Sequence, residues 1–164
     1  MRPDRQIELL ERVATSGPKF EGLQAEASMI NQASVYVDPD RYALEQELLF
    51  RPGPVFFGLS VDLPEPGSYR EMRFDGIPIV VVRQSDGSLR ALVNACRHRG
   101  APLVEPGSSG RGLSAFSCPY HSWTYELSGR LRARPASAGA FDDVTANCDL
   151  LTRPVAEQYG LIFV

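Results

Sequence analysis

The chain has 164 residues, of which 43% are hydrophobic and 23% are charged, and its formal net charge is -3. This length and hydrophobic content suit one globular domain with its own core and exclude a disordered chain. The slightly acidic balance provides no cationic field for a phosphate backbone, which argues against a nucleic-acid partner.

Two helices are predicted near the start of the chain. Apolar residues recur at helical spacing across residues 4–15, and a Gly-Pro pair at residues 17–18 ends that pattern. A second helix is predicted to begin at Asp38-Pro39, because a capping carboxylate before a proline is a typical helix start, and to run through Phe50. We therefore expect an N-terminal helical segment over residues 1–53.

After the helices the apolar period changes from 3.6 to 2, and short segments rich in β-branched and aromatic residues predict strands. An Asp-Gly pair at residues 86–87 predicts a hairpin turn, and residues 136–147 show little pattern and are predicted to be a loop. The fold class is therefore mainly β, with antiparallel sheets over residues 54–164 preceded by two helices. The predicted strands are residues 55–58, 69–74, 77–83, 89–94, 113–116, 123–126 and 131–134, followed by one long closing strand over 154–164.

The sequence also predicts a location. No stretch approaches about 18 consecutive apolar residues, so no membrane span is expected. The first residues are charged and lack the apolar run of a secretory signal. These features predict a cytoplasmic protein.

Two short segments carry the residues that indicate chemistry. Cys96 and His98 form a Cys-x-His pattern, and Cys118 and His121 form a Cys-x-x-His pattern. The whole chain has three cysteines and two histidines, so these segments hold both histidines and two of the three thiols. Both segments follow predicted strand ends, and we expect them side by side at one tip of the fold. This concentration of soft ligands predicts a metal site.

The order of the ligands distinguishes between two kinds of metal site. Structural zinc sites commonly place a close pair of cysteines before a close pair of histidines. In a Rieske [2Fe-2S] centre two thiolates hold one iron and two histidines hold the other, so each segment must reach both irons. Here each segment offers one ligand of each kind, which favours the Rieske cluster. The third thiol, Cys148, is interpreted as an inert cysteine.

Residues 96–101, Cys-Arg-His-Arg-Gly-Ala, and residues 118–125, Cys-Pro-Tyr-His-Ser-Trp-Thr-Tyr, resemble the N-terminal Rieske domain of the large (alpha) subunit of Rieske non-haem iron aromatic-ring-hydroxylating oxygenases. The resemblance covers most of residues 36–164. The sequence departs from the family pattern in a longer spacer between the two segments. It also has Ser122 where the family has glycine, which tolerates a positive φ better than serine does.

The resemblance implies a Rieske fold and a [2Fe-2S] cluster bound by Cys96, His98, Cys118 and His121. It also implies that electrons arrive from a ferredoxin or flavin reductase and leave through His121 toward a mononuclear Fe(II) in a neighbouring oxygenase subunit. The family likeness further implies a homotrimeric parent protein. That iron would need a 2-His-1-carboxylate set.

Both histidines of this chain lie in the two cluster segments, so the sequence assigns no catalytic residue here. Any O2-dependent mono- or dioxygenation belongs to the parent protein. The chain ends within an apolar run, and we expect it to be part of a longer polypeptide, lacking a C-terminal catalytic domain.

The resemblance also suggests the redox potential. Two imidazoles in place of two thiolates predict a potential of roughly -150 to +300 mV. Trp123 stands where high-potential Rieske proteins carry a serine, although Tyr125 is kept, so the lower half of that range is expected. Ser122 is a candidate hydrogen-bond donor to a bridging sulfide.

The neighbours of the ligands have simpler interpretations. Trp123, Tyr120 and Tyr125 are expected to pack beneath the cluster segments, and Arg97 and Arg99 are expected to be solvated charges. Two alternative functions remain open: a stand-alone Rieske ferredoxin-type electron carrier and a zinc-stabilised interaction module. The helical N-terminal segment favours the oxygenase domain over the carrier.

Overall fold

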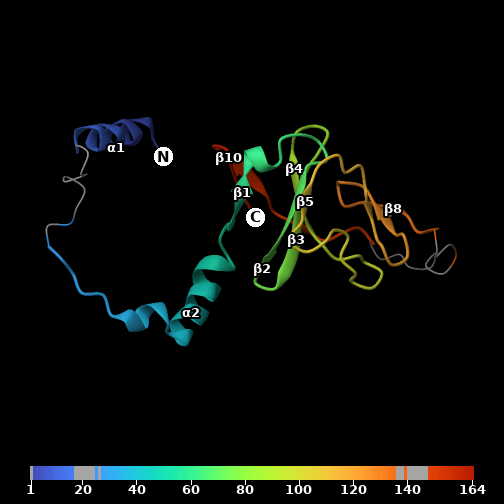
Figure 1. Ribbon diagram of the computed structural model, residues 1–164, viewed down its shortest axis with the longest axis horizontal. Helices are drawn as coiled ribbons and strands as arrows, with labels where there is room; N and C mark the ends of the chain where they lie inside the picture. Colours follow the sequence, from blue (N-terminus) through green and yellow to red (C-terminus); the bar gives the residue numbers. More distant parts are fainter. Residues whose placement is uncertain (1, 17–24, 26, 136–138, 140–147) are drawn as a thin grey trace. The chain divides into compact units, whose positions relative to one another are not determined.

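The computed structural model describes residues 2–16, 25, 27–135, 139 and 148–164 (Figure 1). The chain divides into two compact units, Met1–Ala43 and Leu44–Val164. The Gly-Pro pair predicted to end the first helix lies outside the described residues, as does nearly all of the loop predicted over residues 136–147.

Both predicted helices are present. Helix α1 (Pro3–Thr15) has its proline in the first turn, where a missing N–H costs nothing, and the backbone N–H of Ser16 closes its last turn. A 3₁₀ turn follows at Ala33–Tyr36. Helix α2 (Pro39–Glu45) continues as a π-helical turn over Gln46–Phe50.

The predicted helix cap is also confirmed. The side-chain oxygen Oδ1 of Asp38 accepts hydrogen bonds from the backbone N–H groups of Asp40 at 2.9 Å and Arg41 at 3.3 Å. These N–H groups would otherwise be unpaired in the first turn of α2, so the aspartate stabilises the helix start.

Within its described residues, the second unit has eleven short strands, and the pairings among them are antiparallel. The strands are β1 (Phe56–Leu59), β2 (Tyr69–Phe74), β3 (Ile77–Arg83), β4 (Leu89–Val93), β5 (Ser109–Gly110), β6 (Phe116–Ser117), β7 (Thr124–Tyr125), β8 (Leu131–Ala133), β9 (Thr152–Arg153), β10 (Ala156–Gln158) and β11 (Leu161–Phe163). They form a five-stranded sheet in the order β5-β2-β3-β4-β9 and two three-stranded sheets, β1-β11-β10 and β6-β7-β8 (Figure 1).

The mainly β fold class is confirmed, and the first four predicted strands match β1 to β4 closely. The prediction of one long closing strand is wrong. The chain instead forms the hairpin β10–β11, because Tyr159 and Gly160 have φ of 54° and 79° and make a two-residue turn. Positive φ at both central positions is what such a tight hairpin turn requires.

Two apolar clusters pack on opposite faces of the five-stranded sheet. Alternate residues of β3 point to opposite faces, so Val80 and Val82 join one cluster while Ile79 and Val81 join the other. The first cluster also contains Phe116, Trp123, Tyr125 and the thiols of Cys96 and Cys118. The second contains Phe57 and Ile162 from the β1-β11-β10 sheet. The continuous apolar run of β3 therefore reflects burial on both faces.

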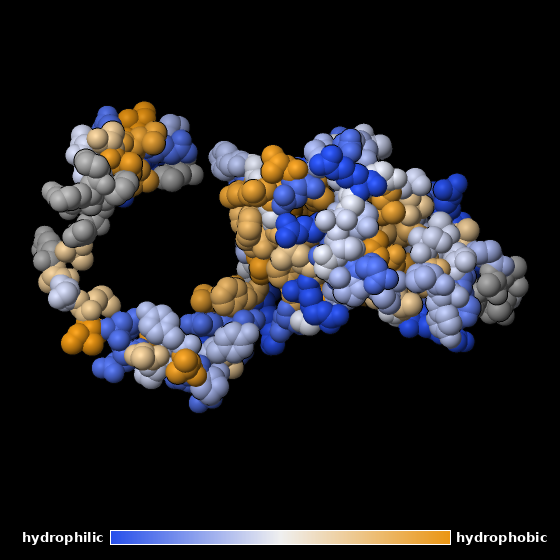
Figure 2. Space-filling view, in the orientation of Figure 1, coloured by the Kyte–Doolittle hydropathy of each residue, from blue (hydrophilic) through white to orange (hydrophobic). Residues whose placement is uncertain are grey.

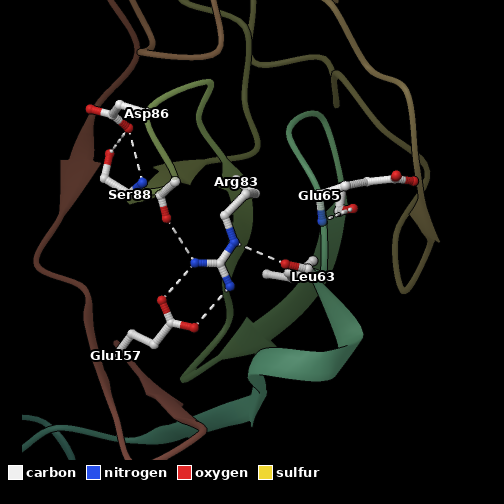
Figure 3. A network of polar contacts seen from close by, with 8 residues as sticks. Leu63, Glu65, Arg83, Asp86, Ser88 and Glu157 are labelled. Carbon is white, nitrogen blue, oxygen red and sulfur yellow. Dashed lines mark hydrogen bonds and ion pairs between the residues drawn. The ribbon is translucent and has the colours of Figure 1, made fainter.

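A polar network at the end of β3 joins two of the sheets (Figure 3). The guanidinium of Arg83 donates to the backbone carbonyls of Leu63 and Gly87, both at 2.9 Å. It also binds the carboxylate of Glu157 on β10 in a bidentate pair, at 2.6 and 2.8 Å. This hydrogen-bonded pair lowers the pKa of Glu157 to about 2. The charge of a nearly buried arginine is thus compensated.

Apolar side chains remain at the surface of the second unit. Phe56 and Leu59 on β1 and Leu161 on β11 are all exposed, and Figure 2 shows apolar surface in the region where β1 and β10 lie. Among the described residues, none of the helices combines the length and the apolar character needed to cross a lipid bilayer.

Candidate metal centre

The four predicted ligands lie in two loops that leave strand ends on the same side of the core. Loop 1 (residues 96–101) follows β4, and loop 2 (residues 118–123) connects β6 to β7. Cys96 and Cys118 belong to the same buried cluster, and the rings of His98 and His121 are in contact. The two segments therefore lie side by side, as predicted.

The two loops have the same backbone hydrogen bonds. In each, the cysteine N–H donates to the carbonyl five residues later, and the residue four positions later donates back to the cysteine carbonyl. All four N···O distances lie between 2.8 and 3.0 Å. The residue at that fourth position has a positive φ in both loops, 73° at Gly100 and 56° at Ser122. Ser122 thus adopts the left-handed conformation at the position where the resemblance led us to expect glycine, which tolerates a positive φ better than serine does.

The thiols are buried. Cys96 and Cys118 are each 2% exposed, and the Sγ atom of Cys96 lies 3.3 Å from Oη of Tyr125. That phenol oxygen accepts a hydrogen bond from the backbone N–H of Arg97 at 3.1 Å, which leaves its own O–H able to donate to the sulfur. Burial raises the pKa of the Cys96 thiol, and burial also raises the pKa of Tyr125, with the contact to Cys96 adding to it.

The imidazoles form a second pair. The ring centroids of His98 and His121 are 4.8 Å apart with an interplanar angle of 64°. Nδ1 is buried in both rings, and Nδ1 of His121 makes no hydrogen bond to any residue that the structure describes. Desolvation, followed by the charge of Arg99, lowers the pKa of His98 and favours the neutral ring. Neutral imidazole is the form that binds a metal ion.

This arrangement fits an iron–sulfur cluster. A charge on Cys118 raises the pKa of Cys96, so the two buried thiols would ionise together only next to a cation. A buried imidazole nitrogen without a hydrogen bond also requires a partner. The ligands come as one sulfur pair and one imidazole pair, and a two-iron Rieske cluster takes such pairs.

The aromatic neighbours match the predictions in two cases of three. Trp123 and Tyr125 are buried at 1% and 0% exposure, as expected, and Trp123 stacks on His98 with a centroid distance of 5.1 Å and an interplanar angle of 7°. Tyr120 was expected to pack beneath the loops, and this prediction is wrong. Its side chain is 57% exposed because it lies at the tip of loop 2. There its ring contacts that of His121, with 3.8 Å between the ring centroids.

Asn94 is a supporting residue that the sequence analysis did not identify. Its side chain is buried, accepts the N–H groups of Leu103 at 2.8 Å and Val104 at 3.1 Å, and donates to the Val104 carbonyl at 2.8 Å. It therefore fastens the chain leaving loop 1 to the end of β4, two residues before Cys96. A polar residue at the end of an apolar strand, just before a ligand, was the available signal.

Charge is distributed unevenly around the loops. Arg97 and Arg99 are exposed, as predicted. Residues 90–134, which contain both loops, hold seven arginines and two glutamates and so carry a net charge of +5. The chain as a whole carries -3, so its acidic residues are concentrated elsewhere in the sequence. The cluster segment is therefore locally basic.

Comparisons with known proteins agree with this geometry. Residues 54–152 match the family described as the Rieske [2Fe-2S] domain. The glycine betaine monooxygenase oxygenase subunit of Chromohalobacter salexigens is 33% identical over 98% of this chain and 37% of its own length. The chlorobenzene dioxygenase alpha subunit of a Cupriavidus species is 35% identical over 79% of this chain and 28% of its own length.

A solved structure shows the same fold. The quaternary ammonium Rieske monooxygenase CntA, in complex with L-carnitine, superimposes with a TM-score of 0.70 at 28% identity, over 79% of this chain and 36% of that one. The chain thus spans little more than a third of the length of these relatives at most. The family match argues against the alternative function of a zinc-stabilised interaction module. The chain belongs to the Rieske [2Fe-2S] domain family, and its relatives are alpha subunits of Rieske oxygenases.

Proposed function

We propose that this chain is the electron-transfer domain of a Rieske oxygenase large subunit, with Cys96 and Cys118 binding one iron and His98 and His121 the other. The observation that carries the proposal is the pairing of buried thiol with thiol and of ring with ring across two loops that have the same backbone hydrogen bonds. Fixed loops of this kind hold their ligands in place without reorganisation when charge changes.

The residues of the chain have distinct roles in this function. The bound cluster supplies a centre that accepts and releases one electron at a time. Tyr125 is placed to donate a hydrogen bond to the Cys96 sulfur, which stabilises added negative charge there. The hydrophobic cluster beneath the loops excludes water from the two sulfurs.

We infer that the electron donor is an acidic ferredoxin or flavin reductase. The +5 charge of residues 90–134 supports this, because opposite charge steers two proteins into contact and raises the rate of association. Arg97 and Arg99 are exposed within loop 1 and are the nearest cations to the ligands in sequence. We propose that electrons leave through His121 toward a mononuclear iron in a neighbouring subunit, in a homotrimeric parent.

The parent protein is proposed to be a mono- or dioxygenase whose catalytic iron lies outside this chain. We propose residues 1–53 as an N-terminal helical segment of that parent and residues 54–164 as its Rieske domain. The match to the glycine betaine monooxygenase oxygenase subunit covers 98% of the chain, including the helical segment, and so favours an oxygenase over a stand-alone carrier. We propose a cytoplasmic location for the parent protein.

The test is chemical analysis of protein purified without oxygen. About two iron atoms and two labile sulfides per chain are expected, with a Rieske-type EPR signal after reduction by dithionite. Cys96→Ser and His121→Cys should each abolish the native signal, whereas the control Cys148→Ser should keep it. A colourless protein loaded with zinc, or either ligand variant with an unaltered signal, would contradict the proposal.

A further inference from the structure

The two histidines are held by different means, and each is held with help from the opposite loop. The ring of His98, in loop 1, stacks almost parallel to Trp123 of loop 2, with an interplanar angle of 7°. Trp123 is 1% exposed and belongs to the core, so it cannot turn without disrupting the packing around it. The orientation of His98 is therefore set by the core.

The ring of His121 lies against Tyr120, which has no such support from the core. Tyr120 is 57% exposed, and its ring meets that of His121 at a centroid distance of 3.8 Å. Arg99, from loop 1, reaches across to this tyrosine. Its Nη1 atom donates to the phenol oxygen at 3.3 Å, and the guanidinium carbon lies 5.7 Å from the centre of the ring.

We propose that Arg99 and Tyr120 act as positioning residues for His121. Together they form a clasp between the two loops, in which the guanidinium of Arg99 holds the Tyr120 ring and the Tyr120 ring limits rotation of the imidazole. This inference rests on the proposed function, because it matters only when His121 binds the cluster. It assigns Arg99 a specific contact beyond that of a solvated loop charge.

The structure provides a way to separate this contact from the effect of charge alone. Arg97 lies in the same loop, is also exposed, and carries the same charge, and its guanidinium is not part of the clasp. Removal of either charge should lower the reduction potential, because positive charge near the cluster stabilises the reduced state. Only removal of Arg99 should also release Tyr120 and His121.

The experiment compares Arg99→Gln with the matched control Arg97→Gln in the protein that carries its native cluster. Pulsed EPR of the reduced protein resolves the nitrogen couplings of the two histidine ligands, and voltammetry gives the potential. In Arg99→Gln one nitrogen coupling should change and the other should stay. In Arg97→Gln both couplings should stay, while both variants shift to a lower potential. Arg99→Lys, which keeps a cation at the ring, should restore most of the native coupling.

Tyr120 gives a second test that does not depend on Arg99. Tyr120→Leu should alter the same single coupling, and Tyr120→Phe, which retains the ring but not the hydroxyl, should alter it less. Couplings in Arg99→Gln and Tyr120→Leu that equal those of the wild type would overturn the clasp, as would a change in both histidines at once. Failure of the proposed function would look different, since the wild-type protein would then contain no cluster signal.

Discussion

Loop 1 and loop 2 present their ligands with the same backbone hydrogen bonds, and they are fastened to the fold in different ways. Loop 2 lies between two strands that pair directly, with Ser117 opposite Thr124. Loop 1 leaves β4 and continues into an irregular connection, and the side chain of Asn94 binds that connection at Leu103 and Val104. Equivalent loop geometry can therefore be supported by strand pairing or by one buried amide.

The largest expected effect concerns this difference in fastening. Asn94→Ala should lower the free energy of unfolding by about 3 kcal/mol, because it leaves two N–H groups and one carbonyl near the core without their partner. Anaerobic denaturation of the cluster-bound protein, followed by circular dichroism, measures the change. Asn94→Asp should also lose stability, because the oxygen that replaces Nδ2 would face the Val104 carbonyl, acceptor against acceptor, and would bury a charge.

The matched change in loop 2 is Thr124→Val, which removes a hydroxyl that donates to the Ser122 carbonyl at 3.0 Å. This bond is exposed, and its loss should cost no more than about 0.5–1 kcal/mol. A loss as large as that of Asn94→Ala would show that loop 2 also depends on a side chain, and the contrast between the loops would then be wrong.

The second prediction tests whether the difference between the loops is local. Arg83 and Glu157 join the five-stranded sheet to β10 and contact neither loop. Glu157→Gln should lower the free energy of unfolding by about 2 kcal/mol, less than for a fully buried pair because the glutamate is 32% exposed. Loss of the Arg83–Glu157 pair should destabilise the whole second unit. It should leave unchanged the difference in unfolding free energy between Asn94→Ala and Thr124→Val.

The same pair predicts a pH dependence. The pKa of Glu157 is about 2 in the folded protein and near 4.5 ordinarily, so its ionised form stabilises the fold. That stabilisation is fully present above about pH 4.5 and is lost as the pH falls toward 2. Denaturation midpoints measured between pH 6 and 3 should fall more steeply for the wild type than for Glu157→Gln. Parallel curves would contradict this account.

The sequence predicted the parts of this molecule that depend on local pattern. The capping role of Asp38 and the strands β1 to β4 follow from residue type and spacing, and these were predicted correctly. The four proposed ligands could also be selected, because soft ligands are rare in the chain and are grouped. The turn at Tyr159-Gly160 was missed because an aromatic residue before a glycine lacks the Asn-Gly or Asp-Gly signal of a tight hairpin turn.

Contacts between distant segments could not be predicted. Glu157 lies 74 residues from Arg83 in sequence, and Arg99 lies 21 residues from Tyr120, so no periodicity connects either pair. Tyr120 was predicted to pack beneath the loops together with Trp123 and Tyr125, and its exposure depends on how the tip of loop 2 turns. Tertiary structure, and not residue preference, decides these positions.

The third prediction exchanges the residue type at the equivalent positions of the two loops. Gly100→Ser should lower the free energy of unfolding by about 1 kcal/mol, because serine at φ 73° is strained. An added Cβ at Gly100 would meet no atom within 4 Å beyond its two chain neighbours, so only the backbone conformation contributes. A loss well above this value in the denaturation experiment would indicate a steric role for the glycine.

The smallest expected effect is the reverse exchange. Ser122→Gly relieves the strain at φ 56° and adds freedom to the unfolded chain, so a net gain of about 0.5 kcal/mol is expected. If the loops are equivalent, this gain and the loss in Gly100→Ser should be of opposite sign and differ in size by no more than about 0.5 kcal/mol. Voltammetry on the same variant tests the hydroxyl itself, because a donor to a bridging sulfide would hold the potential higher in the wild type. A potential unchanged by Ser122→Gly would show that Ser122 has no part in setting the potential and only occupies a strained backbone position in loop 2.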